Sequence, residues 1–259
     1  IFTGISLVVA FLITRSFERL AEAARLKSEF VSIVSHQLRS PLSNLAWGLE
    51  FLMSGSAGKV QESQTGYLQI LKENSSRMQE LVNDLLVVSR IHEGTLPWKR
   101  ESFSFEELLQ DILAEYRPYI AASNIKLQAQ GQENLPKLLG DATQLRHVIS
   151  NLLENAIRYA QKESKDMAVP KENFIQIRYR KKGRNLLFEI EDNGVGIPAG
   201  DQRYIFQKFF RSSNILRHET QGSGLGLYIA KSIIERGEGS IGFHSKEHEG
   251  STFWFSIPF

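Results

Sequence analysis

The chain has 259 residues and carries 31 Lys and Arg against 29 Asp and Glu, which leaves a net charge of +2. So small an excess argues against a nucleic-acid-binding protein. The absence of Cys excludes disulfides, thiol catalysis and Cys-ligated metals, and the six His follow no spacing typical of a metal site. With 42% apolar residues, the length is sufficient for about two globular domains.

The first fourteen residues, IFTGISLVVAFLIT, are apolar and uncharged. They fall short of the roughly 20 residues that a helix needs to cross a bilayer. Because the chain begins with Ile rather than Met, we expect a fragment in which residues 1–14 are the C-terminal part of a transmembrane helix. A buried core helix and a signal-peptide core are the alternatives. The positive flank would then be cytoplasmic: Arg15, Arg19, Arg25 and Lys27.

Residues 15–29 are rich in Ala, Glu, Arg and Leu, which favour a helix. We expect this linker helix to continue into Phe30–Leu52, FVSIVSHQLRSPLSNLAWGLEFL, where apolar residues recur at steps of three and four. His36 lies at the edge of that apolar stripe, and Pro41 frees the carbonyl of Gln37 by removing one backbone donor. A single His on a helix is more typical of a solvated or structurally hydrogen-bonded side chain than of a reactive one.

A turn of Gly and Ser at residues 54–58 precedes a second predicted helix, from about Glu62 to Glu93. Its seam alternates steps of four and three and comprises Tyr67, Leu71, Asn74, Met78, Leu81, Leu85 and Val88. Two long helices with a short loop predict an antiparallel hairpin over residues 30–96. One hairpin cannot bury the apolar faces of both helices, so we expect two to pair as a four-helix bundle in a homodimer. An intramolecular helical domain is the alternative.

A second domain is predicted over residues 97–259, with Pro97 and Trp98 marking its boundary with the hairpin. Ser104 and Glu107 have the spacing of a capping box at a helix start. Further helices are expected over residues 141–160 and 225–236. Strands are expected over residues 125–129, 174–181, 186–191, 240–244 and 251–257, the last two joined across Glu249–Gly250. The pattern predicts an α+β protein whose second domain is an α/β sandwich, one mostly antiparallel sheet covered by helices.

The helix over residues 141–160 carries Asn151 and Asn155 on one face, with Arg158 about one turn further on. An amide oxygen is a suitable hard ligand for Mg²⁺, and a guanidinium can neutralise phosphate charge. Asn pairs on helices are more often plain surface residues, so this motif is weak by itself.

Asp192 ends a predicted strand and is followed by N-G-V-G-I-P. The strand would place the carboxylate at the base of a pocket, where it can accept a hydrogen bond from an amine such as the exocyclic NH₂ of adenine. Gly194 and Gly196 let the backbone approach a ligand closely. A plain tight turn is the alternative.

The third motif is G-S-G-L-G-L at Gly222–Leu227, directly before a predicted helix whose N–H groups and dipole suit phosphates. It is neither a P-loop nor the GxGxxG fingerprint. The preceding segment, Phe206–Gln221, contains Phe206, Phe209 and Phe210 and predicts a lid hinged by Gly. Ordinary core packing is the alternative for these Phe residues.

These motifs jointly resemble a known family. S-H-Q-L-R-S-P-L around His36 resembles the phosphoacceptor box of the sensor histidine kinases of bacterial two-component systems. N-L-L-E-N-A-I-R-Y, E-D-N-G-V-G-I-P, Y-I-F-Q-K-F-F-R and G-S-G-L-G-L-Y-I-A-K resemble the asparagine, glycine and phenylalanine boxes of the Bergerat-type ATPases. Both together, over roughly residues 24–257, select the histidine kinases within that superfamily.

The resemblance implies a site for ATP and Mg²⁺. Asn155 would hold the metal, Asn151 and Arg158 would lie at the phosphates, Tyr159 would pack on adenine, and Asp192 would bind its amine. The glycines of the third motif would shape the lid, and Ser251-Thr252 matches a last small box near adenine. The implied nucleotide-binding set is Asn151, Asn155, Arg158, Tyr159, Asp192, Gly194, Gly196, Gly222, Gly224, Leu225, Gly226 and Thr252.

The resemblance also implies a reaction: transfer of the γ-phosphoryl group to His36 and then to an Asp of a response regulator receiver domain. The protein would be anchored in the bacterial inner membrane with its kinase core in the cytoplasm. Two catalytic-box residues depart from the family pattern, Gln37 where an acidic residue is usual and Ser40 where Thr or Asn is usual. Gln37 leaves open a degenerate kinase that acts as a phosphatase or a nucleotide-gated binding module, and an ATPase clamp is a third possibility.

Overall fold

A computed structural model describes Arg15, Val31 and residues 33–160, 172–216 and 222–259. The chain divides into two compact units, Ile1–Leu96 and Pro97–Phe259. The transmembrane remnant expected over residues 1–14, and all of the expected linker helix except Arg15, lie outside the described residues. Within the described ranges, no helix combines the length and the apolar character that crossing a membrane requires.

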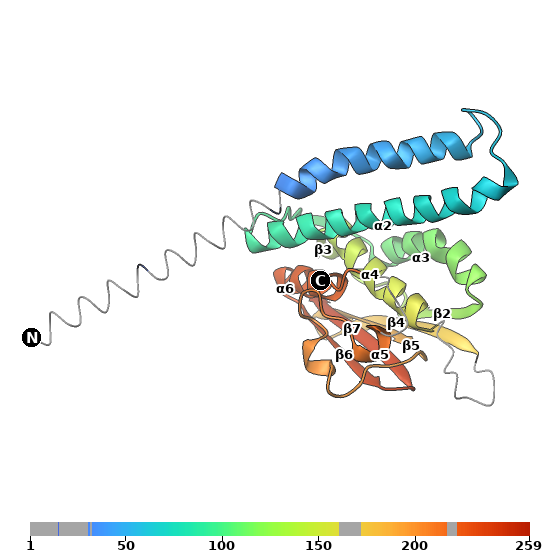
Figure 1. The fold of residues 1–259 in the computed structure, drawn as a ribbon. Helices are drawn as coiled ribbons and strands as arrows, with labels where there is room; N and C mark the ends of the chain where they lie inside the picture. The colour runs from blue at the N-terminus through green and yellow to red at the C-terminus, as the bar shows by residue number, and fades with distance from the viewer. Residues whose placement is uncertain (1–14, 16–30, 32, 161–171, 217–221) are drawn as a thin grey trace, which may run out of the picture. The chain divides into compact units, whose positions relative to one another are not determined.

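The first unit is a helical hairpin (Figure 1). Its first helix covers residues 33–53 and continues through Pro41, and α2 covers Glu62–His92. Arg39 donates to the amide oxygen of Asn83 at 3.1 Å, and Lys72 pairs with Glu50 at 3.5 Å. The first contact joins the N-terminal part of the first helix to the C-terminal part of α2, and the second joins the C-terminal part of the first helix to the N-terminal half of α2. The two helices therefore run antiparallel.

The second unit contains a five-stranded sheet in the order β2-β4-β5-β7-β6. Only the β2–β4 pair is parallel, and the other three pairs are antiparallel. The strands are β2 (Ile125–Gly131), β4 (Asn173–Lys182), β5 (Asn185–Asp192), β6 (Ser240–Lys246) and β7 (Gly250–Pro258). A separate antiparallel pair joins β1 (Glu101–Phe103) to β3 (Leu138–Gly140).

Three helices cover one face of this sheet (Figure 1). They are α3 (Phe105–Ala122), α4 (Ala142–Ala160) and α6 (Gly226–Arg236), and α4 packs against both of the others. A short 3₁₀ turn, η1 (Gln202–Tyr204), and a four-residue helix, α5 (Ser213–Leu216), lie between β5 and α6. The architecture is therefore the helical hairpin followed by a sheet-and-helix domain that the sequence predicts.

Side chains along β5 alternate between the two faces of the sheet, and this alternation determines which of them face the helices. Leu186 and Phe188 are fully buried and Ile190 is nearly so, and the Phe188 ring stacks on Phe255 with ring centroids 4.8 Å apart. Because side chains of a strand alternate between the two faces, Asp192 continues this buried row. The aromatic core thus fixes the side of the sheet on which the terminal carboxylate lies.

The structure corrects one local expectation and adds one pair of strands that the sequence did not predict. The β6–β7 turn occupies residues 247–249, whereas Gly250 pairs with Lys246 inside the ladder. The pair β1–β3 was not expected from the sequence, since three-residue strands are too short to show a periodicity.

The start of α4 generates a stability prediction. The Asp141 carboxylate is buried, accepts the Gln144 N–H at 3.0 Å as a helix cap, and accepts the Lys99 N–H at 2.8 Å. We expect Asp141→Ala to lower the unfolding free energy of the second unit by about 1–3 kcal/mol, since it leaves two backbone donors unpaired.

Urea unfolding in a Trp47→Phe background measures this, because Trp98 and Trp254 then report on the second unit alone. Asp111→Ala is the matched control, since Asp111 is an exposed carboxylate paired with Arg146 at 3.6 Å. Equal effects of the two substitutions would contradict the capping role.

Candidate functional site

Two glycine-containing loops lie directly against the last turns of α4. A Cβ at Gly194 would lie 2.2 Å from the Tyr159 carbonyl oxygen, and a Cβ at Gly226 would lie 2.7 Å from Asn151 Oδ1. Both positions therefore require Gly because a side chain would displace α4 or its Asn. The loop after β5, the turn before α6 and the end of α4 thus form one site.

Asp192 is the buried ionisable group of this site. Its side chain is 5% exposed, and its Oδ1 accepts the Gly194 N–H at 2.9 Å. Burial raises the pKa of Asp192 to about 7; the backbone N–H groups of Gly194 and Ser251 act against that rise, and the nearby Glu191 adds to it. A carboxylate held so far from water is suited to bind a ligand that brings its own hydrogen-bond donor.

The other end of the site offers donors to an anion. The Asn151 Nδ2 atom is buried and makes no hydrogen bond to the part of the chain that the structure describes. The first residue of α6, an eleven-residue helix, lies against the same side chain, since a Cβ at Gly226 would lie 2.7 Å from Asn151 Oδ1. An unpaired buried amide donor next to a helix N-terminus matches the requirements of a phosphate.

Arg158 and Gly222 lie close together in the same region. Gly222 has φ +108°, and a Cβ there would lie 2.9 Å from Arg158 Nη1. Asn155, Arg158 and Tyr159 are half-buried on α4, so their functional groups are within reach of solvent. The structure therefore brings together the α4 residues, Asp192 and the glycine turns that the sequence motifs single out.

Thr252 requires a correction. In the β5–β7 ladder Asp192 pairs with Ser251, and Thr252 pairs with Glu191. Paired residues of an antiparallel ladder share a face, so Ser251, which is 8% exposed, lies on the Asp192 side of the sheet. Thr252 lies on the other face with Glu191. Phe253 and Phe255, two and four residues further along β7, are buried on the same face as Ser251.

The three Phe residues of the predicted lid have different environments. Phe206 packs edge-on against Phe243, at 6.0 Å between centroids, and Phe210 contacts Tyr204 at 5.5 Å. Phe209 is 63% exposed and has φ +62°, a conformation that costs a non-glycine residue roughly 1–2 kcal/mol. The remainder of the predicted lid includes residues 217–221, which lie outside the described residues.

His36, Gln37 and Ser40 lie on the first helix of the hairpin, and all three are exposed. An exposed imidazole is accessible to a second protein or domain, as a group that receives and passes on phosphate must be. These residues belong to the first unit, whereas the glycine-lined site belongs to the second.

The residues fit an adenine nucleotide. Asp192 offers an acceptor for an amine at one end, and Asn151 and the α6 N-terminus offer donors for phosphates at the other. The described residues contain no cluster of three or more His, Asp or Glu able to hold a metal ion. The Asn155 side chain, half-buried on α4, has an amide oxygen of the kind that Mg²⁺ accepts as a ligand.

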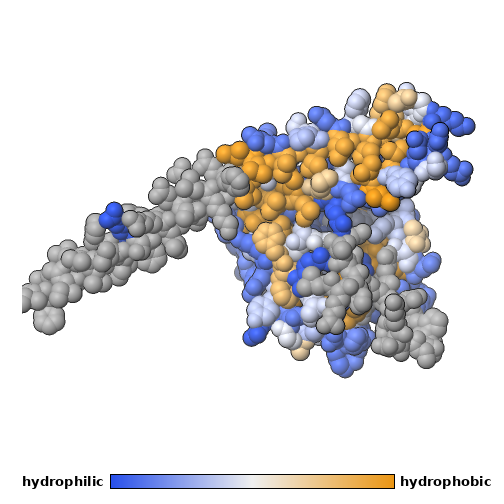
Figure 2. Space-filling view, viewed as in Figure 1, coloured by the Kyte–Doolittle hydropathy of each residue, from blue (hydrophilic) through white to orange (hydrophobic). Residues whose placement is uncertain are grey.

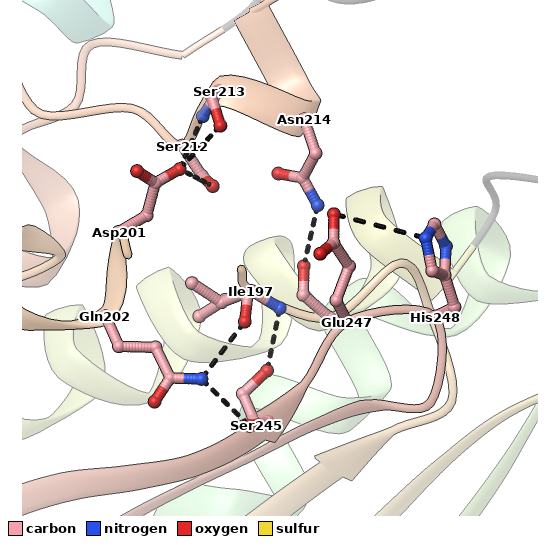
Figure 3. A network of polar contacts seen from close by, with 10 residues as sticks. Ile197, Asp201, Gln202, Ser212, Ser213, Asn214, Ser245, Glu247 and His248 are labelled. Atoms are coloured by element: carbon pink, nitrogen blue, oxygen red, sulfur yellow. Dashed lines mark hydrogen bonds and ion pairs between the residues drawn. The ribbon is translucent and has the colours of Figure 1, made fainter. Parts of the chain in front are cut away.

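Sequence reasoning missed a polar network behind this site (Figure 3). Ser245 Oγ accepts the Ile197 N–H at 2.9 Å and lies 2.9 Å from Ser251 Oγ. Gln202 donates to the carbonyl oxygens of Ile197 and Ser245 at 3.1 and 3.0 Å. Isolated Ser and Gln residues give no sequence pattern, so only the folded chain reveals their role.

Two family models match the chain. Residues 26–94 match the His Kinase A (phospho-acceptor) domain, and residues 140–259 match the Histidine kinase-, DNA gyrase B-, and HSP90-like ATPase. The chain belongs to the sensor histidine kinase family. One relative, the sensor protein GacS of Pseudomonas syringae pv. syringae, is 32% identical over 237 residues, which cover 91% of this chain and 25% of GacS. The chain thus spans about a quarter of the length of that histidine kinase relative.

Solved histidine kinase structures share the fold. Full-length ShkA in complex with AMPPNP superposes with a TM-score of 0.71 at 23% identity, over 89% of this chain and 46% of that one. Histidine kinase ThkA in complex with the response regulator protein TrrA gives a TM-score of 0.58 at 21% identity, over 91% and 64% of the two chains. At these identities the likeness concerns the histidine kinase fold.

Burial of Asp192 predicts a pH-dependent stability. The pKa of Asp192 is about 7 in the folded chain and 3.8 in the unfolded chain. At a pH between these two values, Asp192 therefore takes up a proton when the chain folds. The unfolding free energy therefore falls as pH rises through this window. We expect Asp192→Asn to lose this part of the pH dependence and to be no less stable than the parent above about pH 7.

Urea unfolding at about pH 5 and about pH 8, again in the Trp47→Phe background, measures the difference between the two proteins. Because Glu191 and all other titrating groups are common to both, their contributions largely cancel. Parallel pH profiles would show that the Asp192 carboxylate is not held in this costly position.

Proposed function

We propose that the chain is an ATP-dependent protein-histidine kinase that phosphorylates His36 and passes the phosphoryl group to an Asp of a response regulator. The observation that carries the proposal is the presence of two buried polar groups in the second unit: the Asp192 carboxylate, which can accept a hydrogen bond, and the Asn151 amide Nδ2, a donor without a partner among the described residues. The match of residues 26–94 to a phosphoacceptor domain supports His36 as the site that receives phosphate.

At the nucleotide, each end has its own residues. Asp192 binds the adenine amine, and Tyr159 packs on the ring. The N–H groups around Gly222, Gly224, Leu225 and Gly226 bind phosphates together with Asn151 and Arg158, while Gly194 and Gly196 let the loop after β5 approach the base. Asn155 holds Mg²⁺, which neutralises phosphate charge when bound.

At the acceptor, the reaction needs an imidazole with a free lone pair on one nitrogen and a hydrogen-bonded N–H on the other. Gln37 follows His36 directly, and its amide oxygen can accept that N–H and so fix the tautomer. An amide cannot take up a proton, and it stabilises developing imidazolium charge less than a carboxylate. Ser40 retains a hydroxyl one turn further along, which suits the positioning of water for dephosphorylation of the regulator.

The hairpin supports a homodimer. Figure 2 shows hydrophobic residues gathered along the hairpin. Many of its apolar side chains are more than one third exposed, among them Leu38, Leu45, Leu52, Tyr67, Leu71, Met78 and Leu81. These residues follow the heptad steps of both helices, so they form one face rather than scattered positions. Burial of that face in a four-helix bundle with a second copy removes it from water. Residues 1–14 would anchor the dimer in the inner membrane, with the kinase core in the cytoplasm.

The first experiment tests the kinase reaction. The chain is incubated with γ-labelled ATP and Mg²⁺ beside His36→Ala and Asn155→Ala. We expect acid-labile, base-stable label on the parent chain, none on His36→Ala, and a large reduction for Asn155→Ala because the metal loses its protein ligand.

Two other outcomes would redirect the assignment. Nucleotide binding without label would favour the phosphatase or binding-module reading, with Gln37 as its cause. Release of free phosphate at an equal rate from the parent and His36→Ala would instead indicate an ATPase.

Replacement of Gln37 by Glu tests the acceptor chemistry. We expect Gln37→Glu to autophosphorylate faster, by about tenfold, since a carboxylate next to the imidazole stabilises its positive charge. The initial rate of label incorporation at saturating ATP measures this, with Asn44→Asp as a control for an added charge elsewhere on the first helix. An unchanged or lower rate would contradict the role given to Gln37.

A charge placed on the seam tests the dimer. We expect Leu45→Asp to convert the protein to a monomer, because the buried carboxylate would have no partner in the bundle. Trp47→Asp is the control. Trp47 is 68% exposed, and it lies two residues after Leu45, a rotation of about 200° that places it on the opposite side of the helix from the seam. Sedimentation velocity distinguishes the two forms, and a Leu45→Asp dimer would contradict the proposed interface.

A further inference from the structure

Asp201 lies outside the nucleotide-binding set, yet it is the centre of a group of hydrogen bonds (Figure 3). One of its carboxylate oxygens accepts the Ser212 hydroxyl at 2.6 Å, the Ser213 N–H at 2.7 Å and the Ser213 hydroxyl at 2.9 Å. The Asp201 carboxylate therefore ties the residue before η1 to the first residue of α5. The segment between these two points contains the phenylalanine box, Y-I-F-Q-K-F-F-R at residues 204–211.

A second set of bonds holds the same loop to the sheet. The Asn214 amide donates to the Gly196 carbonyl at 3.1 Å, and Gln202 donates to Ser245 on β6 at 3.0 Å. Ser245 in turn contacts Ser251, the ladder partner of Asp192. One end of the phenylalanine box is thus fixed to β6, and the other to the loop that follows β5.

The box supports the phosphate end by direct backbone contact. Gly224 has φ +68°, and a Cβ there would lie 2.8 Å from the Phe209 carbonyl carbon and 3.0 Å from the Phe210 oxygen. Gly224 precedes Leu225 and Gly226, which begin α6 beside Asn151. A shift of the Phe209–Phe210 backbone would therefore move the turn that presents the phosphate-binding N–H groups.

We propose that Asp201 is a positioning residue for the phosphate end of the nucleotide site: by closing the phenylalanine box onto α5 it holds the Phe209–Phe210 backbone against Gly224. The inference rests on the proposed function, because it assumes that this site binds ATP. Asp201 acts through the box and makes no contact with the nucleotide.

The carboxylate charge matters to this role. Hydrogen bonds from Ser212 and Ser213 hold the pKa of Asp201 below its usual range, so the ionised form is the one that the loop favours. Charge-assisted bonds are about twice as strong as those between neutral groups. An Asn at this position keeps the shape and one acceptor but loses the charge.

The test compares two ligands of the 259-residue chain, AMPPNP with Mg²⁺ and adenosine, by displacement of a fluorescent ATP analogue. We expect Asp201→Asn to weaken AMPPNP binding by about tenfold and to leave adenosine binding within about twofold. Ser212→Ala, which removes one of the three donors, should weaken AMPPNP binding about threefold in the same direction. Asp111→Asn makes the same charge change at an exposed ion pair and should alter neither affinity.

The difference between the ligands is decisive, since a general loss of folding would weaken both alike. If Asp201→Asn binds AMPPNP as the parent does, or loses both ligands by the same factor, the inference is wrong and the nucleotide site stands. If Asp201→Asn does not fold, Ser212→Ala decides by the same criterion. A parent chain that binds neither ligand overturns the proposed function, and this inference with it.

Discussion

A buried carboxylate at the end of a strand constrains the whole of the second unit. Asp192 continues the row of Phe188 and Ile190 into the helix-covered face of the sheet, where water cannot solvate its charge. Hydrogen bonds from two backbone N–H groups offset part of the free-energy cost of burying the charge, and the part that is not offset raises the pKa of Asp192. A fold selected for stability alone would place an apolar residue there, so the buried carboxylate indicates a functional role.

The glycines follow from that constraint. The loop that follows Asp192 lies directly on α4, and Gly194 permits that contact with the Tyr159 carbonyl. On the far side Gly226 makes room for Asn151, and Gly224 rests on the Phe209–Phe210 backbone. The site is therefore assembled from close contacts, with backbone at Gly194 and Gly224 and with a side chain at Gly226, that a Cβ would obstruct, which explains why its motifs are rich in glycine.

The two units divide the proposed chemistry between them. The hairpin exposes His36 on one helix and an apolar seam along both, while the second unit holds the groups suited to ATP. Within the second unit, the hydrogen bonds of Asp201 and Gln202 join the segment after β5 to α5 and β6.

The sequence by itself determined the elements and the family, because helix and strand periodicities and the glycine and asparagine boxes are local patterns. It also singled out Asp192, Asn151 and the turns around them. The tertiary structure decided which face each residue occupies: Ser251 rather than Thr252 lies beside Asp192, since ladder register is a property of two strands. The roles of Asp201, Gln202 and Ser245 depend on contacts between residues far apart in the chain, which no local pattern records.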